Sequence, residues 1–134
     1  MRNTRGITLI ELLIVVTVMG LMAAMAIPQF GRLRVQWQVD GAAQQLVGDL
    51  SRARVEAVKR NAIVWLARTD ATTYTIQYIG KRSLPGTVQF TAGPDTVKFA
   101  AFGPALVGAG TFTLALSTFT KKVEVNAAGF ASVR

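Results

Sequence analysis

The pattern of hydrophobic residues divides the chain into three parts. From Ile7 to Ile27 it is almost continuously apolar, since 17 of these 21 residues are Ala, Val, Ile, Leu or Met. As a helix this run would be about 32 Å long at 1.5 Å per residue, which matches a bilayer hydrocarbon core of roughly 30 Å. The pattern predicts that residues 7–28 form a helix able to span a membrane, closed by Pro28.

The second part, residues 29–61, has the period of an amphipathic helix. Apolar residues spaced by three and four form one stripe, which consists of Val39, Ala43, Leu46, Leu50, Ala53 and Ala57. Polar residues with the same spacing lie one position earlier, and these are Gln45, Asp49, Arg52, Glu56 and Lys59. We expect the apolar stripe to face a core and the polar residues to form a solvated face rather than a binding patch.

The end of this helix is also marked in the sequence. Arg52 and Glu56, and Glu56 and Arg60, have the i,i+4 spacing of helical ion pairs. Asn61 follows, and Asn tolerates the left-handed backbone that often ends a helix. We expect helix over residues 30–60.

Beyond Asn61 the apolar residues alternate with polar ones, which is the period of a half-buried β-strand. The alternating sets are Tyr74, Ile76 and Tyr78; Val88 and Phe90; Val97 and Phe99; Phe112, Leu114 and Leu116; and Val123 and Val125. A first strand is expected within 62–68 and the next over 73–79.

Turn-forming residues separate these strands. The expected turns are Gly80–Ser83, Pro85–Gly86, Gly93–Asp95 and Ala127–Gly129. The run from Phe102 to Gly110 has three Gly and no charge, and we expect it to be a mobile surface loop. The whole pattern predicts an α+β fold, in which a long N-terminal helix packs against a C-terminal antiparallel β-domain over 62–134, with one sheet or two.

Composition narrows the function. The chain has 134 residues, which fits one domain, and contains neither Cys nor His. This excludes Cys/His metal sites, His-dependent nucleophilic catalysis and disulfides, so we expect no enzyme, no cofactor and no metal. The net charge is +8, yet only 16% of residues are charged, below the roughly 25% of an ordinary soluble domain.

One acidic residue, Glu11, interrupts the apolar run. A carboxylate near a bilayer centre costs on the order of 2.5–3.5 kcal/mol or more, so an ionisable residue there indicates a function and a partner. Ile14 and Val15 occupy the i+3 and i+4 positions, so the same helix face offers no cation to Glu11. Its partner is therefore expected outside this segment.

A secretory signal peptide is an alternative interpretation of the N-terminal part. Arg2 and Arg5 would be its basic start, and Ala24–Ala26 has the small-x-small pattern of a cleavage site. The apolar run is longer than the roughly 7–15 residues usual in signal peptides, and a disposable segment has no use for Glu11. These two features favour a retained helix.

The start of the apolar run has the sequence Arg5-Gly6-Ile7-Thr8-Leu9-Ile10-Glu11-Leu12-Leu13. It combines a basic stub, a Gly, a long apolar run and a Glu at the fifth position after the Gly. This combination resembles the class III prepilin leader of type IV pilins and type II secretion pseudopilins. Ile7 stands where the family usually has Phe.

The resemblance implies that residues 1–6 are a leader peptide. Prepilin peptidase would cleave between Gly6 and Ile7 on the cytoplasmic side of the inner membrane, and would N-methylate Ile7. A residue without a side chain at position 6 lets a protease approach the backbone closely. Loss of Arg2 and Arg5 would lower the net charge from +8 to +6.

The resemblance also gives roles to three residues of the apolar run. Glu11 would pair with the N-terminal amine of a neighbouring subunit and guide register during filament assembly. The stretch from Gly20 to Pro28 would be where the helix kinks or melts within the filament. An ordinary helix break at the membrane exit is the alternative for Pro28.

Within this superfamily the chain is most similar to the GspH/FimT-type minor pseudopilins, because it has a long helix, then only β-structure, and no Cys. This implies a structural subunit of a type II secretion pseudopilus, a type IV pilus or a competence pseudopilus, at the tip or along the shaft. The implied partners are prepilin peptidase, other pilin-type subunits, an inner-membrane assembly platform and, before assembly, the lipid bilayer. The implied location is a single-pass inner-membrane anchor with the β-domain in the periplasm.

DNA binding in natural transformation is the alternative function. Some FimT-like members use a Gly-Arg-x-Arg motif near the C-terminus, but here Phe130 and Ser132 stand where its arginines would follow Gly129. The remaining candidates for contact with DNA are Lys81, Arg82, Lys121, Lys122 and Arg134. They would contact phosphates only if the fold gathers them, since adjacent strand residues point to opposite faces.

Overall fold

The computed structural model describes residues 7–134, apart from the side chains of residues 26–29. One helix, α1 (Leu9–Arg60), is followed by nine strands. Residues up to Arg34 and residues 35–134 form two compact units, and α1 contributes to both. The helix predicted over 30–60 is confirmed, and Asn61 ends it with a positive φ of 48°.

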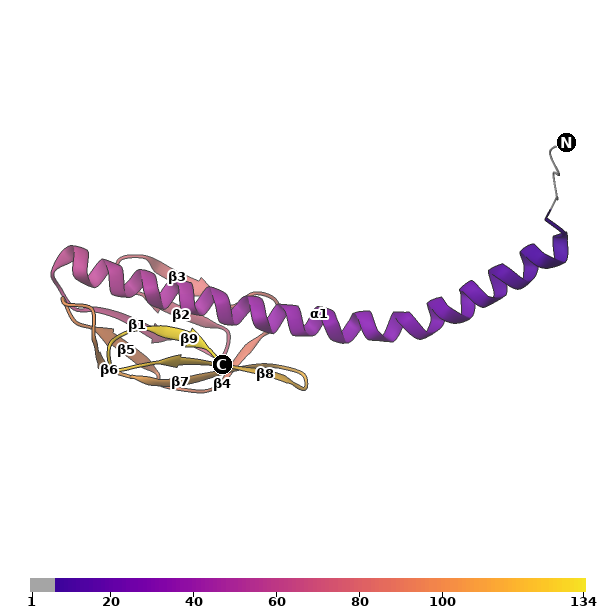
Figure 1. The fold of residues 1–134 in the computed structure, drawn as a ribbon. Coiled ribbons are helices and arrows are strands. Elements are labelled where there is room, and N and C mark those ends of the chain that lie inside the picture. The colour runs from indigo at the N-terminus through magenta and orange to yellow at the C-terminus, as the bar shows by residue number, and fades with distance from the viewer. Residues whose placement is uncertain (1–6) are drawn as a thin grey trace, which may run out of the picture. The chain divides into compact units, whose positions relative to one another are not determined.

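The strands form two antiparallel sheets, so the expected α+β fold is confirmed (Figure 1). The five-stranded sheet has the order β3-β2-β1-β5-β6, and the four-stranded sheet has the order β4-β7-β8-β9. The bounds are β1 (Val64–Arg68), β2 (Thr73–Ile76), β3 (Gly80–Ser83), β4 (Gln89–Ala92), β5 (Thr96–Phe99), β6 (Ala105–Val107), β7 (Gly110–Leu116), β8 (Phe119–Val125) and β9 (Ala131–Val133).

The core of the second unit lies between α1 and both sheets. Every residue of the predicted apolar stripe is buried, and Ala42 joins it. Its partners are core residues of both sheets, among them Leu66, Tyr74, Phe99, Phe112, Leu114 and Val123. Four Ala in the stripe are fully buried, so the helix backbone can approach the sheets closely.

Two predictions about the first hairpin are wrong. Gly80–Ser83 is not a turn but strand β3, paired with β2 in the register Tyr74↔Arg82. β2 ends at Ile76, and Tyr78 lies in the turn before β3 with a φ of 67° and 59% exposure. Since β3 is an edge strand with all four residues exposed, it has no alternation of apolar and polar residues by which it could be recognised.

The predicted loop Phe102–Gly110 also contains a strand. β6 pairs with β5 in the register Lys98↔Val107, and Gly103 and Gly108 lie on either side of it with positive φ angles. Backbone hydrogen bonds form this strand, and they need no alternating side chains. The other three predicted turns do connect strands.

The connection between β1 and β2 is organised by Asp70. Its carboxylate accepts hydrogen bonds from the backbone N–H and the hydroxyl of both Thr72 and Thr73, at 2.7–3.0 Å. The Thr73 hydroxyl and the Thr72 N–H are the main causes that lower the pKa of Asp70 to about 2.

Candidate functional site

The N-terminal segment begins with a capped helix. The backbone N–H of Glu11 lies 3.3 Å from Oγ1 of Thr8 and 3.1 Å from the Thr8 carbonyl oxygen. Thr8 and Glu11 have the Thr-x-x-Glu spacing of a capping box, which the sequence contains but the pattern of apolar residues does not reveal. Glu11 therefore lies in the first turn of α1, where the helix dipole favours a negative charge.

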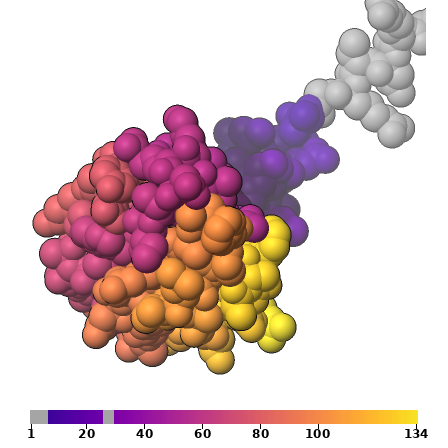
Figure 2. Space-filling model, turned by 90° about the vertical axis from the view of Figure 1, so that its left-hand side faces the viewer, coloured from indigo at the N-terminus to yellow at the C-terminus, as the bar shows by residue number. Residues whose placement is uncertain are grey.

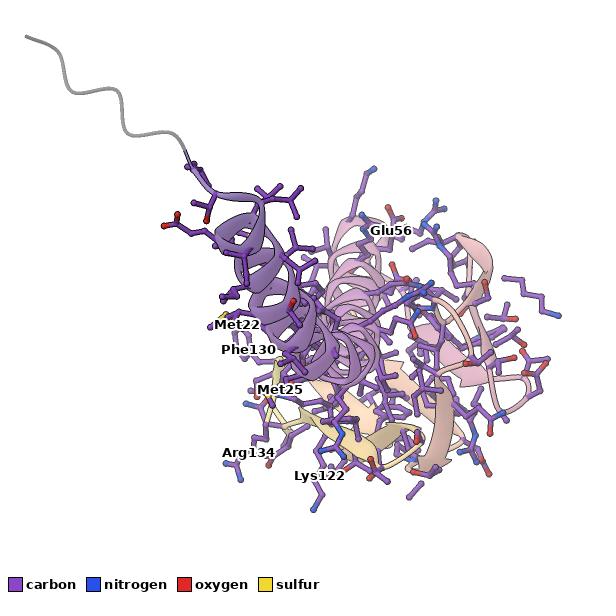
Figure 3. All side chains as sticks on the ribbon, turned by 90° about the vertical axis from the view of Figure 1, so that its right-hand side faces the viewer. Met22, Met25, Glu56, Lys122, Phe130 and Arg134 are labelled. Carbon is purple, nitrogen blue, oxygen red and sulfur yellow. The ribbon has the colours of Figure 1, made fainter. Side chains whose placement is uncertain are left out.

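The apolar side chains of this segment face outward. An 18-residue window of α1 near the N-terminus has a mean hydropathy of 2.4, and none of it is buried. Met22 and Met25 extend from this half of the helix (Figure 3) and are 69% and 76% exposed. By length and composition the segment can span a membrane, and its exposed surface needs either lipid or other helices around it.

The residues predicted for processing and for helix melting lie partly outside the part of the chain that the structure describes. Gly6 is not among the described residues, and Ile7 is the first that is. The backbone of α1 is helical at Gly20 and continues as helix past Pro28, so the expected end of the first helix at Pro28 is wrong. Cleavage after Gly6, methylation of Ile7 and melting between Gly20 and Pro28 therefore stay predictions.

A second group of functional interest is a polar cluster in the second unit. Asp49 was expected on a solvated face, but only 3% of it is exposed. Its Oδ2 accepts a hydrogen bond of 2.8 Å from the hydroxyl of Tyr74, and Nε2 of Gln45 donates to the same hydroxyl oxygen at 3.1 Å. The prediction was wrong because strand β2 brings a phenol against this side of α1.

Two arginines complete this cluster. Nη1 of Arg52 donates to Oδ1 of Asp49 at 3.2 Å, and Nε of Arg82 on β3 lies 4.0 Å from Oδ2. Arg52 thus pairs with Asp49 rather than with Glu56, which Arg60 and Lys59 contact instead. The ion pair predicted between Glu56 and Arg60 is confirmed at 2.8 Å and lowers the pKa of Glu56.

The cluster borders an open cleft of about 480 Å³ between α1 and β3. Its lining consists of Gln45, Asp49, Arg52, Lys81, Arg82 and Ser83. Nε2 of Gln45 donates to the Ser83 carbonyl oxygen at 2.8 Å, which ties the helix to the outer side of the strand. The cleft holds three cationic side chains and one carboxylate.

The basic residues predicted for DNA are not brought together. Lys81 and Arg82 lie on β3, whereas Lys121, Lys122 and Arg134 belong to the other sheet. Lys121 forms an ion pair with Asp40 at 3.1 Å, and Arg134 forms one with Glu124 at 2.9 Å.

Lys122 and Arg134 are both exposed and lie side by side at neighbouring strands of the four-stranded sheet. Their backbones exchange two hydrogen bonds, and both side chains point away from the sheet (Figure 3). The structure therefore offers one small basic patch here rather than a continuous stripe.

Arg54 forms a further cluster that the sequence did not indicate. Its Nε donates to the carbonyl oxygen of Gly103 at 2.9 Å, and its guanidinium lies 4.1 Å from the centroid of the Phe130 ring. These contacts join the last turns of α1, the loop after β5 and the C-terminal residues on one side of the molecule (Figure 2). No periodic pattern relates three residues so far apart in sequence.

Two family models match separate parts of the chain. Residues 1–27 match the family model of the prokaryotic N-terminal methylation motif. Residues 42–129 match the family model described as type II transport protein GspH.

Known proteins also resemble the chain. A pilin-like protein PilA1 from Thermus thermophilus is 42% identical over 62 residues, covering 46% of this chain and 38% of that protein. A fimbrial protein of Pseudomonas aeruginosa is 33% identical over 106 residues, covering 75% of this chain and 69% of the relative. The crystal structure of the type IV minor pilin FimU from P. aeruginosa has a similar fold, with a TM-score of 0.61 at 16% identity over 72% of this chain and 87% of FimU.

Proposed function

This chain belongs to the GspH family of type II transport proteins, and we propose that it is a minor pseudopilin or pilin, a structural subunit of a type II secretion pseudopilus or a type IV pilus. One observation carries the proposal: a prepilin-type methylation motif and a GspH domain occur in the same chain. The role is assembly rather than catalysis. The fold shared with FimU supports it.

The proposed mechanism is transfer of α1 from lipid to a filament. Prepilin peptidase cleaves after Gly6 and methylates the new N-terminus at Ile7. The exposed apolar segment then leaves the bilayer, and packing against neighbouring helices replaces its contacts with lipid. The carboxylate of Glu11 meets the amine of a neighbouring subunit, so that two charges costly in an apolar environment neutralise each other.

The proposal implies a location and partners. The helix anchors the subunit in the bacterial inner membrane, the β-domain lies in the periplasm, and an assembly platform in the same membrane extracts the subunit. The exposed surface of residues 7–25 supports an anchor of this kind. The remaining partners are the other pilin-type subunits of the filament.

The state of the N-terminus in the native membrane tests this function. Intact mass and an N-terminal peptide spectrum should show a chain that starts at Ile7 and carries one added methyl group. A chain that starts at Ile27 would mean an exported soluble domain, and an unprocessed Met1 would mean a simple membrane anchor. Either of these two results would contradict the filament mechanism.

A further inference from the structure

The cleft between α1 and β3 has the properties of a binding site for a carboxylate-bearing peptide. It combines an excess of positive charge with a sheet edge at which the backbone N–H and C=O of Lys81 are open to pairing. We propose that an acidic, extended segment of a partner protein adds as a strand to β3 and places a carboxylate between Arg52 and Arg82. The site is separate from the N-terminal segment and goes beyond the proposed assembly function.

The charges in the cleft are incompletely neutralised. Asp49 is its one carboxylate, and this group already accepts hydrogen bonds from Tyr74 and Arg52. The side chains of Arg52 and Arg82 are 64% and 43% exposed, while that of Asp49 is 4% exposed. Each guanidinium carries five N–H donors, so a single contact with Asp49 leaves several available to an incoming carboxylate.

Asp49 also orients the two arginines. It lies below them, with one oxygen 3.2 Å from Arg52 and the other 4.0 Å from Arg82. A buried carboxylate within 4.0 Å of both guanidinium groups restricts their positions, and such preorganisation lowers the entropy lost on binding. Lys81 adds a third cation at the rim, which gives the cleft a net charge of +2.

The backbone of β3 presents pairing groups toward the same side. The N–H of Leu84 donates to the carbonyl oxygen of Thr72 at 2.8 Å, so in this antiparallel pair residues 82 and 84 point toward β2. Ser83 and Lys81 then point outward, as the bond from Gln45 to the Ser83 carbonyl oxygen shows. The outward N–H and C=O of Lys81 can accept an added strand.

The pairing of β3 with β2 determines on which face of the sheet the side chain of Arg82 lies. Arg82 lies directly opposite Tyr74 and therefore on the face of the sheet that packs against α1. Alternate side chains of an added strand would lie on that same face. A carboxylate at one such position would meet Arg82 from the strand and Arg52 from the helix.

These features favour a peptide over a nucleic acid. Pairing with the edge of β3 requires a peptide backbone, and a cleft of about 480 Å³ has room for a few side chains. The exposed basic pair Lys122 and Arg134 lies on the other sheet, so the cleft is not part of a long cationic track for phosphates. The net charge of the chain without residues 1–6, which is +6, gives a further attraction to an acidic partner.

The test uses the full chain in detergent micelles and a fluorescent peptide of alternating Thr and Glu. Fluorescence anisotropy should show saturable binding that the same peptide with Gln in place of Glu does not show. Arg82→Gln should weaken binding about tenfold, the effect of losing one charge-assisted hydrogen bond. Lys98→Gln removes a charge from an exposed position on β5 and should leave the affinity within about twofold.

Two Lys81 variants test strand addition separately from charge. Lys81→Gln removes the cation, while Lys81→Pro also removes the outward N–H without breaking a bond to β2. Thermal unfolding by circular dichroism should show that both variants fold. Lys81→Pro should bind the peptide more weakly than Lys81→Gln.

Three results would overturn the proposal. If Arg82→Gln bound the peptide as tightly as the unmodified chain does, Arg82 would not be part of a carboxylate-binding site. Equal affinities of Lys81→Pro and Lys81→Gln for the peptide would show that the peptide does not pair with β3 as an added strand. If a short DNA duplex bound in an Arg82-dependent way while the acidic peptide did not, the cleft would be a nucleic-acid site.

Discussion

The hydroxyl of Tyr74 donates a hydrogen bond of 2.8 Å to Oδ2 of Asp49 and so joins β2 to α1 inside the second unit. Burial is the main cause that raises the pKa of Tyr74 well above its usual value, and the hydrogen bond to Asp49 adds to the shift. The phenol therefore stays protonated and remains a donor throughout the neutral range. A buried carboxylate with a fixed donor can hold charged residues at the surface above it.

This relationship predicts the stability of two variants. Tyr74→Phe should lower the free energy of unfolding by about 1–3 kcal/mol, because it removes a donor from a buried carboxylate. Asp49→Ala should cost a similar amount, about 1–3 kcal/mol, since it leaves the buried hydroxyl of Tyr74 without its acceptor, whereas water solvates the exposed Arg52 and Arg82. Chemical denaturation in detergent measures both.

Tyr78→Phe is the matched control for this pair. Tyr78 is exposed, and its ring lies 4.4 Å from the guanidinium of Arg60, a contact that Phe preserves. We expect a change within about 0.5 kcal/mol. If Tyr74→Phe were as neutral as Tyr78→Phe, the buried hydrogen bond would contribute nothing to stability.

Asp70 predicts an acid-dependent loss of stability. Its folded-state pKa of about 2 lies below the ordinary value of 3.8, so the charged form favours the fold. The stabilisation should be complete above the unfolded-state pKa and should disappear as the pH falls through about 2. Titration of the Asp70 carboxyl carbon by NMR measures that pKa directly.

Asp70→Asn provides the control for this effect. The amide keeps one acceptor for the turn but has no charge to titrate. Unfolding midpoints of this variant should vary less between pH 4 and pH 2 than those of the unmodified chain. Equal pH dependence of the two proteins would assign the acid sensitivity to other carboxylates.

Two glycines should respond to Ala in opposite directions. Gly129 has a φ of +81°, and a Cβ there would collide with the backbone oxygen of Gly103. Gly129→Ala should therefore lower stability by at least about 2 kcal/mol. Gly48 lies in α1, where a Cβ would meet no atom of the described residues within 4 Å, so Gly48→Ala should raise stability by about 0.5–1 kcal/mol. Thermal unfolding of both variants decides this, and a stable Gly129→Ala would contradict the close approach of the two loops.

Glu11 predicts an assembly defect without a processing defect. Glu11→Ala should be cleaved normally but should enter filaments poorly, because the amine of the neighbouring subunit loses its counter-charge. Glu11→Gln keeps the size of the side chain and should show the same defect. Quantification of sheared or crosslinked filaments measures it, and wild-type assembly of either variant would exclude the charge pair.

Gly6→Ala is the complementary variant for processing. It should leave the precursor uncleaved in the membrane, because a side chain at this position obstructs the peptidase. Immunoblotting of membranes separates the two forms by size. Normal cleavage of Gly6→Ala would show that the small residue is not required.

Much of the fold could be predicted because it follows from periodicity. The apolar residues of a buried face recur with the period of their own helix or strand, as in the stripe ending at Ala57 and in the alternating residues of β5, β7 and β8. An element without a buried face has no such periodic pattern. β3 and β6 were missed for this reason, since both are edge strands held mainly by backbone hydrogen bonds.

The cleft could not be predicted from sequence, for a different reason. Asp49 has the spacing of a solvated residue within α1, and its burial is caused by Tyr74, which lies 25 positions later. The spacing of residues within one helix carries no information about a partner that lies on a strand later in the chain. The cap formed by Thr8 is the opposite case, because both of its residues lie within one turn and the spacing alone indicates it.

The order of the strands has a consequence for how the second unit folds. The chain leaves the five-stranded sheet after β3 to form β4, returns for β5 and β6, and then leaves again for β7, β8 and β9. Neither sheet can be completed before distant parts of the chain have met. Bringing them together closes long loops, and this costs conformational entropy before any stabilising contact forms. Pairing of β1 with β5 and of β4 with β7, each across a long stretch of chain, should therefore limit the rate at which this unit folds.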